Sequence, residues 1–196
     1  MLEKTTCYTN RMRVIAGSAR GRRLAAPPGS DTRPTADRVR EALFSILGTP
    51  PDGAVVLDLF AGAGTLGIEA LSRGAERAVF VDHAPAAARV LRQNLEALDL
   101  AGRAEVHVGD ATRFAARLGR DGRSFTWIFL DPPYAAGLAD AVLAAIDAGG
   151  LLAPDGTVVV EHDRRAPPQP EHGHLLKADC RRYGDTELTF YRIRPP

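Results

Sequence analysis

Short apolar runs alternate with segments of helical periodicity between residues 55 and 160. The apolar runs consist mainly of Val, Ile, Leu and Phe and are too short to be helices, which is typical of strands buried on both faces of a sheet. The segments between them repeat apolar residues every three or four positions, as amphipathic helices do. This alternation predicts a doubly wound, mostly parallel α/β sheet of the Rossmann-like type.

We expect this sheet to contain seven strands. Their predicted ranges are 55–60, 78–81, 105–108, 125–130, 157–160, 175–182 and 187–194. The intervening helices are expected at 66–72, 85–98, 114–118 and 138–148. The last two strands are joined by a short turn, so they must be antiparallel to each other. Because ligands of doubly wound sheets bind beyond the carboxyl ends of the strands, we expect the functional site at that edge.

The first fifty residues do not follow this alternation. Residues 1–11 lack periodicity, and we expect them to be disordered. Segments 13–17 and 22–26 predict a β-hairpin, and an amphipathic helix should follow a linker rich in proline and glycine. We therefore divide the chain into residues 1–11, an N-terminal extension at 12–49, made of hairpin and helix, and a main domain at 50–196.

Charge is unevenly distributed along the chain. The net charge is +1 overall, but residues 11–40 contain eight arginines against two aspartates, a net of +6. Planar guanidinium groups are suited to binding phosphate, so the extension is a candidate nucleic-acid-binding arm on an acidic body. A solvated basic surface is the alternative. The candidate RNA-binding residues are Arg11, Arg13, Arg20, Arg22, Arg23, Arg33 and Arg38.

A glycine turn follows the first predicted strand of the main domain. Residues Gly62-Ala-Gly-Thr-Leu-Gly67 fit the G-x-G-x-x-G pattern that binds nucleotide cofactors between a strand and a helix. Asp82 ends the next strand, where a ribose-binding acid is expected. Asp58 lies four residues before Gly62 and would repel the pyrophosphate of NAD. The sulfonium and ammonium groups of S-adenosylmethionine tolerate such an acid, so the pattern favours this cofactor.

The sequence Asp131-Pro-Pro-Tyr134 follows the fourth predicted strand directly. Two consecutive prolines make the backbone rigid and remove hydrogen-bond donors. The Asp131 carboxylate and the Pro132 carbonyl can therefore accept both hydrogens of an exocyclic NH₂ group and aim its lone pair at a methyl donor. Tyr134 can stack on the base that carries the amine, once that base has left its stack. A tight proline turn without chemistry is the alternative.

These motifs resemble those of class I S-adenosylmethionine-dependent amino-methyltransferases. The match is closer to the bacterial enzymes that methylate guanine N2 in 16S ribosomal RNA. That family's own signatures resemble Arg13-Val-Ile-Ala-Gly17, Gly21-Arg-Arg-Leu24, Thr32 to Glu41 and Tyr183-Gly-Asp-Thr186. The resemblance covers nearly everything from Met12 onward. It leaves open the role of the variable stretch 164–174.

The resemblance implies a role for each motif residue. Asp58 and the glycines would border the methionine end of the cofactor, Asp82 would bind the ribose and Asp110 would lie near the adenine. The implied cofactor-binding residues are Asp58, Phe60, Gly62, Gly64, Gly67, Asp82, His83, Asp110 and Ala111. The implied catalytic residues, which hold the target base, are Asp131, Pro132, Pro133 and Tyr134.

The same resemblance implies the reaction and the partner. The expected reaction is methylation of the N2 amine of a guanine in 16S ribosomal RNA, guanine 966 of the small subunit. The expected partner is this RNA within the assembling small ribosomal subunit. We expect a monomeric cytoplasmic enzyme without membrane contact.

Two other reactions remain as alternatives. The first is methylation of adenine N6 in DNA or RNA. A sequence-specific DNA enzyme would need a recognition domain, yet only 62 residues follow Tyr134. The second is methylation of glutamine N5 in a protein, a family in which asparagine usually replaces the residue at Asp131. A non-catalytic RNA-binding module would not need Asp131.

Cysteines, histidines and apolar runs add no further site. Cys7 and Cys180 lie far apart, and we expect free thiols in a reducing cytoplasm. His172 and His174 lack additional ligands, so we expect no metal site. No apolar run approaches the roughly 18 residues of a membrane span, and we see no signal peptide.

Overall fold

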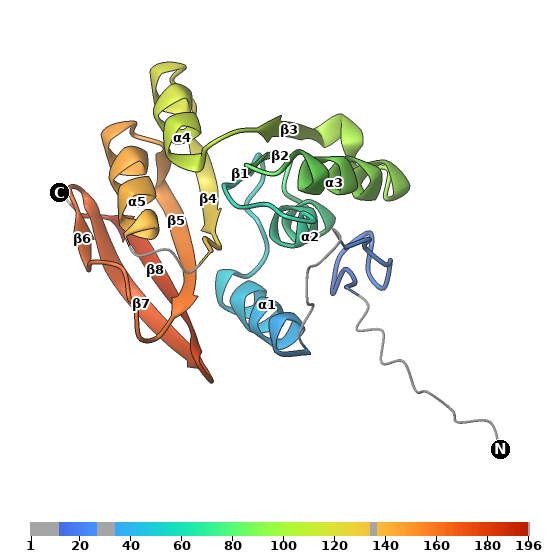
Figure 1. The fold of residues 1–196 in the computed structure, drawn as a ribbon, viewed down its shortest axis with the longest axis horizontal. Coiled ribbons are helices and arrows are strands. Elements are labelled where there is room, and N and C mark those ends of the chain that lie inside the picture. Colours follow the sequence, from blue (N-terminus) through green and yellow to red (C-terminus); the bar gives the residue numbers. More distant parts are fainter. Residues whose placement is uncertain (1–11, 27–33, 134–136, 196) are drawn as a thin grey trace.

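The computed structural model describes residues 12–26, 34–133 and 137–195, so the predicted disorder of residues 1–11 lies outside the described residues. Strands and helices of the described part form three layers, with one sheet between two layers of helices (Figure 1). The helices are α1 (Pro34–Leu47), α2 (Thr65–Ser72), α3 (Pro85–Ala97), the 3₁₀ helix η1 (Ala101–Arg103), α4 (Ala111–Arg120) and α5 (Leu138–Ala148). The strands are β1 (Val55–Asp58), β2 (Arg77–Asp82), β3 (Ala104–Val108), β4 (Phe125–Leu130), β5 (Leu152–Asp163), β6 (Glu171–His172), β7 (Leu175–Tyr183) and β8 (Thr186–Ile193).

The strand order is β3-β2-β1-β4-β5-β8-β7-β6. The first five strands in this order, β3, β2, β1, β4 and β5, pair in parallel. The last three, β8, β7 and β6, continue the sheet with antiparallel pairing. The predicted doubly wound, mostly parallel α/β fold is thus confirmed. The predicted number of seven strands is wrong, because the described sheet has eight. The additional strand β6 is two residues long, too short to show any periodicity in the sequence.

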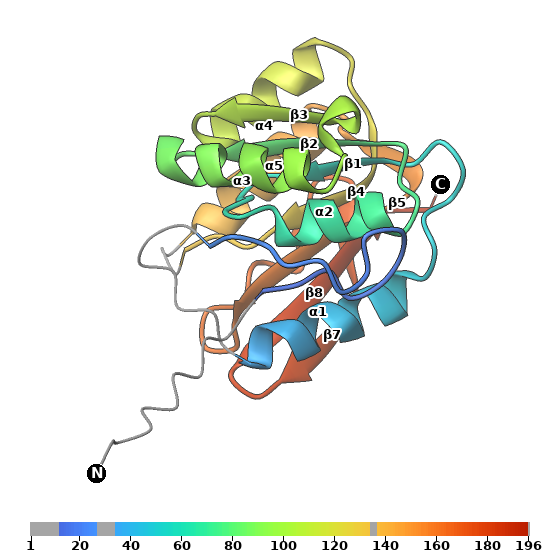
Figure 2. The same cartoon turned by 90° about the vertical axis from the view of Figure 1, so that its right-hand side faces the viewer.

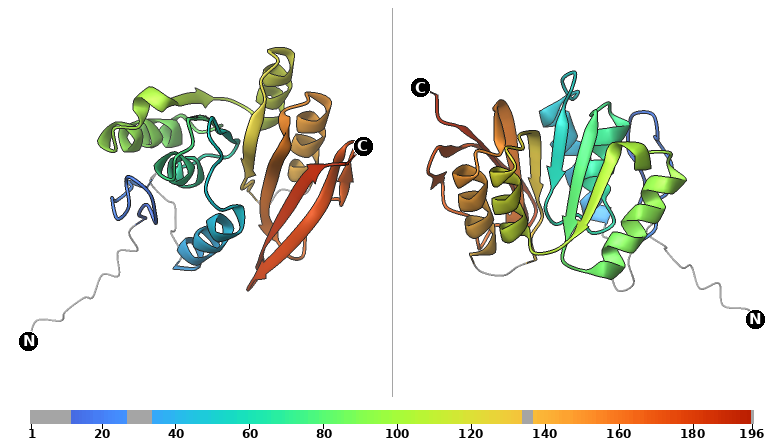
Figure 3. Two further views of the ribbon diagram at one scale, coloured as in Figure 1. Left: turned by 180° about the vertical axis from the view of Figure 1, so that it is seen from behind. Right: turned by 90° about the horizontal axis from the view of Figure 1, so that it is seen from above.

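Helices cover both faces of the sheet and enclose two apolar cores (Figure 3). On one face α1, α2 and α3 bury residues such as Phe44, Ile68 and Leu91. On the other face α4 and α5 bury Phe114 and Ile146 against the sheet. Both faces of the central strands are therefore dry, which explains their continuous apolar runs. No helix in the described ranges has both the length and the apolarity needed to cross a membrane.

The predicted N-terminal hairpin is present in a reduced form. Residues 12–26, here called the N-terminal hairpin, make one isolated antiparallel bridge, between Arg13 and Arg23, in place of two strands. Backbone hydrogen bonds from Val14 to Arg22 and from Leu24 to Met12 hold the bend together. The hairpin lies against α2, on the face of the sheet that α1 also covers (Figure 2).

Helix boundaries follow local capping. The sequence predicts a helix only over 114–118, but α4 begins at Ala111. The side chain of Asp110 accepts a hydrogen bond from the backbone N–H of Arg113 at 2.9 Å, and this cap allows the helix to start three residues earlier.

Candidate active site

The glycine turn connects β1 to α2 at the carboxyl edge of the sheet. Gly64 is the N-cap of α2 and has a φ of 87°, a conformation that favours glycine. A Cβ on Gly67 would lie 2.2 Å from the ring of Phe80 on β2, so this helix can approach the sheet only without a side chain there. Both glycines therefore serve the close strand–turn–helix geometry that the pattern predicts.

Asp82, the last residue of β2, clamps the glycine turn. One carboxylate oxygen accepts a hydrogen bond from the backbone N–H of Gly62 at 2.7 Å, and the other accepts from Ala84 N–H at 2.8 Å. The carboxylate thus joins the end of β2 to the turn after β1. Each oxygen still has a lone pair for another donor, such as a ribose hydroxyl. The neighbouring His83 side chain is exposed, and its Nδ1 lies 3.6 Å from the Asp82 carboxylate.

Asp58, the last residue of β1, is buried beneath the same turn. Its carboxylate accepts a hydrogen bond from the backbone N–H of Gly67 at 3.2 Å. Burial raises the pKa of Asp58 to about 7, and repulsion from the carboxylates of Asp131 and Asp82 adds to the increase, while backbone hydrogen bonds oppose it. Acids from three strands therefore lie close enough to influence one another. Their combined field favours a cationic ligand.

Asp131 follows the last residue of β4 and opens onto the carboxyl edge of the sheet. Water reaches this residue, but enough protein surrounds the carboxyl group that desolvation raises its pKa to about 6. Pro132 is half-buried and Pro133 is exposed. Tyr134, the predicted stacking residue, lies outside the described residues.

The remaining predicted cofactor residues lie at the same edge or behind it. Phe60 is half-buried and packs against the core below α4 and α5. Ala111 is buried at the start of α4. Asp110, which caps that helix, follows β3 just as Asp82 ends β2. The strand predicted over 55–60 ends at Asp58, so Phe60 lies in the turn after β1. The roles of these residues as cofactor ligands remain a prediction.

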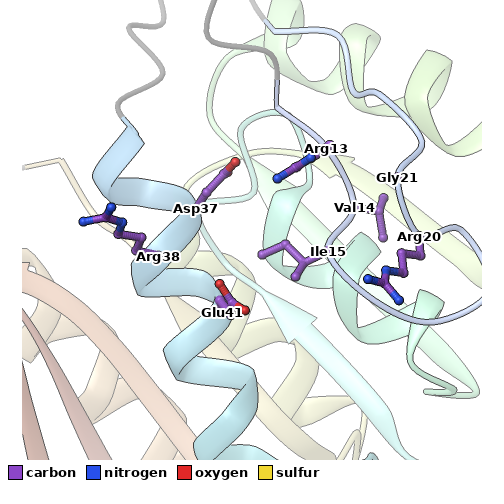
Figure 4. Close-up of a pocket in the computed structure, with 8 residues that line it drawn as sticks. All are labelled: Arg13, Val14, Ile15, Arg20, Gly21, Asp37, Arg38 and Glu41. Atoms are coloured by element: carbon purple, nitrogen blue, oxygen red, sulfur yellow. The ribbon is translucent and has the colours of Figure 1, made fainter.

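The predicted RNA-binding arginines are spread over the N-terminal hairpin and α1. Arg13, Arg20 and Arg38 line a cavity of about 440 Å³ between these two segments (Figure 4). Asp37 and Glu41 line it too, so its charge is mixed. Arg11 and Arg33 lie outside the described residues.

The arginine side chains of this region differ in direction and in hydrogen-bond partners. Figure 4 shows Arg38 pointing away from the hairpin, while Arg13 points toward the space beside α1. Arg22 is exposed but donates a hydrogen bond to the Ala97 carbonyl at the end of α3. Arg40, part of the same basic stretch, is buried and donates to the Arg13 carbonyl at 2.7 Å and to Asp37 at 3.0 Å. Arg40 therefore supports the hairpin, and desolvation lowers its pKa.

Sequence reasoning missed the residues that attach the hairpin to the main domain. Glu69 of α2 is buried and accepts hydrogen bonds from the backbone N–H groups of Ile15 at 2.7 Å and Ala16 at 2.9 Å. It also pairs with Arg73 at 2.8 Å. In the sequence, the only sign of this role is that Glu69 stands between two apolar residues of a predicted helix. That position does not show that the carboxylate binds the hairpin backbone.

Asn94 of α3 makes a second attachment. Its side-chain oxygen accepts from Ala25 N–H at 2.8 Å, and its amide donates to the carbonyls of Ala25 and Ala63, each at 3.0 Å. Ala63 lies inside the glycine turn. One buried amide therefore joins the hairpin directly to the candidate cofactor loop.

Comparisons with known proteins agree with this geometry. The chain is 43% identical to the Bacillus subtilis protein named "Putative rRNA methyltransferase YlbH", over 93% of this chain and 100% of that protein. It is 38% identical to the "Ribosomal RNA small subunit methyltransferase D" of Escherichia coli K12, over 79% of this chain and 76% of the relative. The solved structure "Putative methyltransferase yhhF from Escherichia coli" superposes with a TM-score of 0.81 at 33% identity, over 95% of this chain and 99% of that one.

The fold is accordingly that of class I methyltransferases. A family model described as "Conserved hypothetical protein 95" matches residues 12–192, which includes the N-terminal hairpin, the glycine turn and the last strands. Because this match spans nearly the whole chain, the protein belongs to that family.

Proposed function

We propose that the protein transfers a methyl group from S-adenosylmethionine to the N2 amine of a guanine in 16S ribosomal RNA, with guanine 966 as the target. One observation carries the proposal: Asp58 and Asp82 end neighbouring strands beside the glycine turn, and Asp131 follows the adjacent strand β4. An electronegative cofactor site would then adjoin an acceptor-rich loop. Relatives in the family are named as methyltransferases of ribosomal RNA, which supports RNA as the substrate class.

The proposed cofactor fits the residues at this edge. S-adenosylmethionine supplies a methyl group on a cationic sulfonium. Asp58 would stabilise the positive charge at its methionine end, and Asp82 would accept the ribose hydroxyls while it holds Gly62 in place. No phosphate group has to be accommodated near Asp58.

Asp131 and Pro132 would act on the target amine. The Asp131 carboxylate and the Pro132 carbonyl each accept one N–H of the exocyclic NH₂. This holds the nitrogen in place and favours the pyramidal geometry in which its lone pair can attack. As the N–C bond forms and the methyl–sulfur bond of the donor breaks, the nitrogen would become positive, and the carboxylate would stabilise that charge. The nitrogen would then lose one proton to solvent, which reaches Asp131. Tyr134 would stack on the extruded base.

The N-terminal extension, residues 12–49, would bind RNA for the methyltransferase domain at 50–196. Its arginines would contact phosphates of the structured RNA, while the net acidic remainder repels them. We propose the assembling small subunit as the form of the substrate, bound by a monomer in the cytoplasm.

The cofactor assignment predicts the behaviour of an Asp82→Ala variant. It should bind S-adenosylmethionine more weakly by at least about 1.5 kcal/mol, because it loses a charged hydrogen bond and releases the glycine turn. Titration calorimetry of wild type, Asp82→Ala and the control Asp121→Ala, an exposed aspartate after α4, measures this difference. Saturable binding of NAD with none of S-adenosylmethionine would refute the assignment.

The RNA assignment predicts a salt dependence. Replacing Arg20, Arg22 and Arg23 together with alanine should flatten the log–log slope of RNA affinity against salt by about 0.9 for each phosphate contact that is lost. Filter binding of a 16S RNA fragment across a salt series measures the slope.

A control variant loses the same three positive charges at positions outside the hairpin. Arg77, Arg120 and Arg192 are exposed, and each lies toward the sheet edge opposite the candidate site. Replacing them should leave the slope nearly as in wild type, and neither variant should lose affinity for S-adenosylmethionine. Equal slopes for both triple variants would mean that the hairpin is only a solvated basic surface.

The proposed reaction itself is tested by mapping modified bases. Ribosomal RNA from cells that lack this protein should be missing one N2-methylguanine, which mass spectrometry of nuclease fragments detects. Returning the gene should restore the modification. Loss of an N6-methyladenine or of a methylated protein glutamine would instead support one of the alternative reactions.

A further inference from the structure

A second carboxylate lies next to Asp131. Strands β4 and β5 are parallel, and Leu130 is the register partner of Val160. The residues that follow these partners are Asp131 and Glu161. Both therefore stand at the carboxyl edge of the sheet, on neighbouring strands.

Glu161 lines a cavity of about 230 Å³ beside the proline loop. Pro132 and Pro133 form one side of this cavity, and Pro167 and Pro168, from the segment between β5 and β6, contribute to its lining as well. Proline rings offer rigid apolar surfaces without hydrogen-bond donors. Asp140 and Asp163 line the cavity too, but Asp140 accepts a hydrogen bond from the backbone N–H of Gln169 and Asp163 accepts from Arg165. The cavity thus combines apolar proline walls with the Glu161 carboxylate, a combination suited to a flat ring that carries N–H groups.

Nothing in the described part of the chain donates a hydrogen bond to Glu161 or forms an ion pair with it. Its neighbour Asp163, by contrast, is bound by Arg165. Desolvation raises the pKa of Glu161 to about 8, and repulsion from Asp131 adds to the increase. A half-buried acceptor of this kind is stabilised by a ligand that brings its own N–H donors.

We propose that Glu161 is a specificity-determining residue that selects guanine by accepting the N1–H of the target base, while Asp131 accepts from the N2 amine. This assignment rests on the proposed function. Guanine presents N1–H and the N2 amine side by side on its Watson–Crick edge, and the two neighbouring carboxylates match these adjacent donors. Adenine presents a lone pair at N1, which a carboxylate repels. A proton held by Glu161 in the empty site leaves to solvent when guanine binds.

The test uses RNA in which only the edge of the target base changes. Small-subunit RNA is ligated with either guanosine or 2-aminopurine riboside at the mapped target position. 2-Aminopurine retains the N2 amine but has an acceptor at N1. Single-turnover methylation is measured above pH 8, where Glu161 is mainly ionised, for wild type, Glu161→Gln and the control Glu171→Gln. Glu171 is an exposed carboxylate of β6 that does not line the cavity.

Wild type should prefer guanine over 2-aminopurine at least about tenfold, because a site that is built to accept N1–H rejects a base without it. Glu161→Gln should reduce this preference at least about tenfold, since its amide can donate to the N1 of 2-aminopurine. The control should keep the wild-type ratio, and all three proteins should bind S-adenosylmethionine equally.

An unchanged ratio in Glu161→Gln would overturn the assignment. If that variant did not fold, the wild-type preference would decide, and equal use of both bases would overturn the assignment. A wild type that methylates no guanine would refute the proposed function, and this assignment with it. Guanine methylation by wild type, together with an unchanged ratio in Glu161→Gln, would refute the specificity role alone.

Discussion

Replacing Asp131 with alanine is expected to slow methyl transfer to RNA at least about a hundredfold. The carboxylate accepts a hydrogen of the amine and stabilises the positive charge that develops on nitrogen, so its loss raises the barrier more than it weakens substrate binding. Single-turnover transfer of labelled methyl groups to small-subunit RNA, at saturating cofactor and protein, measures this rate.

Cofactor binding separates this role from a structural one. Asp131→Ala should bind S-adenosylmethionine about as tightly as wild type, since Asp58 and Asp82 stay in place beside the glycine turn. Asp121→Ala removes an exposed carboxylate at the other end of α4 and should methylate RNA at the normal rate. Near-normal turnover by Asp131→Ala would show that the carboxylate does not act on the amine.

Replacing Glu69 with alanine is expected to lower the free energy of unfolding by about 3 kcal/mol. The buried carboxylate accepts two backbone hydrogen bonds from the N-terminal hairpin, and its removal leaves the N–H groups of Ile15 and Ala16 without partners. Arg73 also loses its ion pair. Urea unfolding followed by circular dichroism measures the change.

The hairpin should respond more strongly than the main domain. Limited proteolysis of Glu69→Ala should cut within residues 12–26 faster than in wild type, because two of the bonds that attach this segment are gone. Glu96→Ala, which removes an exposed glutamate from α3, is the matched control and should change stability little. A Glu69→Ala protein as stable as wild type, with an equally protected hairpin, would mean that other contacts suffice.

Local pattern was enough to predict most of the fold and the acids of the site. Buried parallel strands need apolar residues on both faces, so β1, β2 and β4 appear as continuous apolar runs in the sequence. The acids that end these strands must then gather at one edge, as Asp58 and Asp82 do. The need for glycine at position 67 could also be predicted from the local pattern, because the turn between strand and helix leaves no space for a side chain there.

Contacts between distant segments could not be predicted in this way. Arg40 belongs to a basic stretch, yet it is buried beneath the hairpin, where it donates a hydrogen bond to the Arg13 carbonyl. This partner lies 27 residues away in the sequence, so the local pattern could not predict the burial. The pattern around 171–172 is too short to identify β6, whose pairing depends on the position of β7. The hairpin has a single bridge because some of its backbone N–H groups bind the main domain and not the opposite segment of the hairpin. Ile15 donates to Glu69, and Ala25 donates to Asn94.

The sequence by itself determined the alternation of strands and helices, the glycine turn and the acids at the strand ends, because each depends on neighbouring residues and on the strand and helix periods. Only the tertiary structure decided which residues meet across the sheet and between layers. Glu161 is 30 residues from Asp131 in the chain, and the β4–β5 register alone makes them neighbours. Side-chain burial and the partner of a charge depend on such long-range packing, which no local pattern contains.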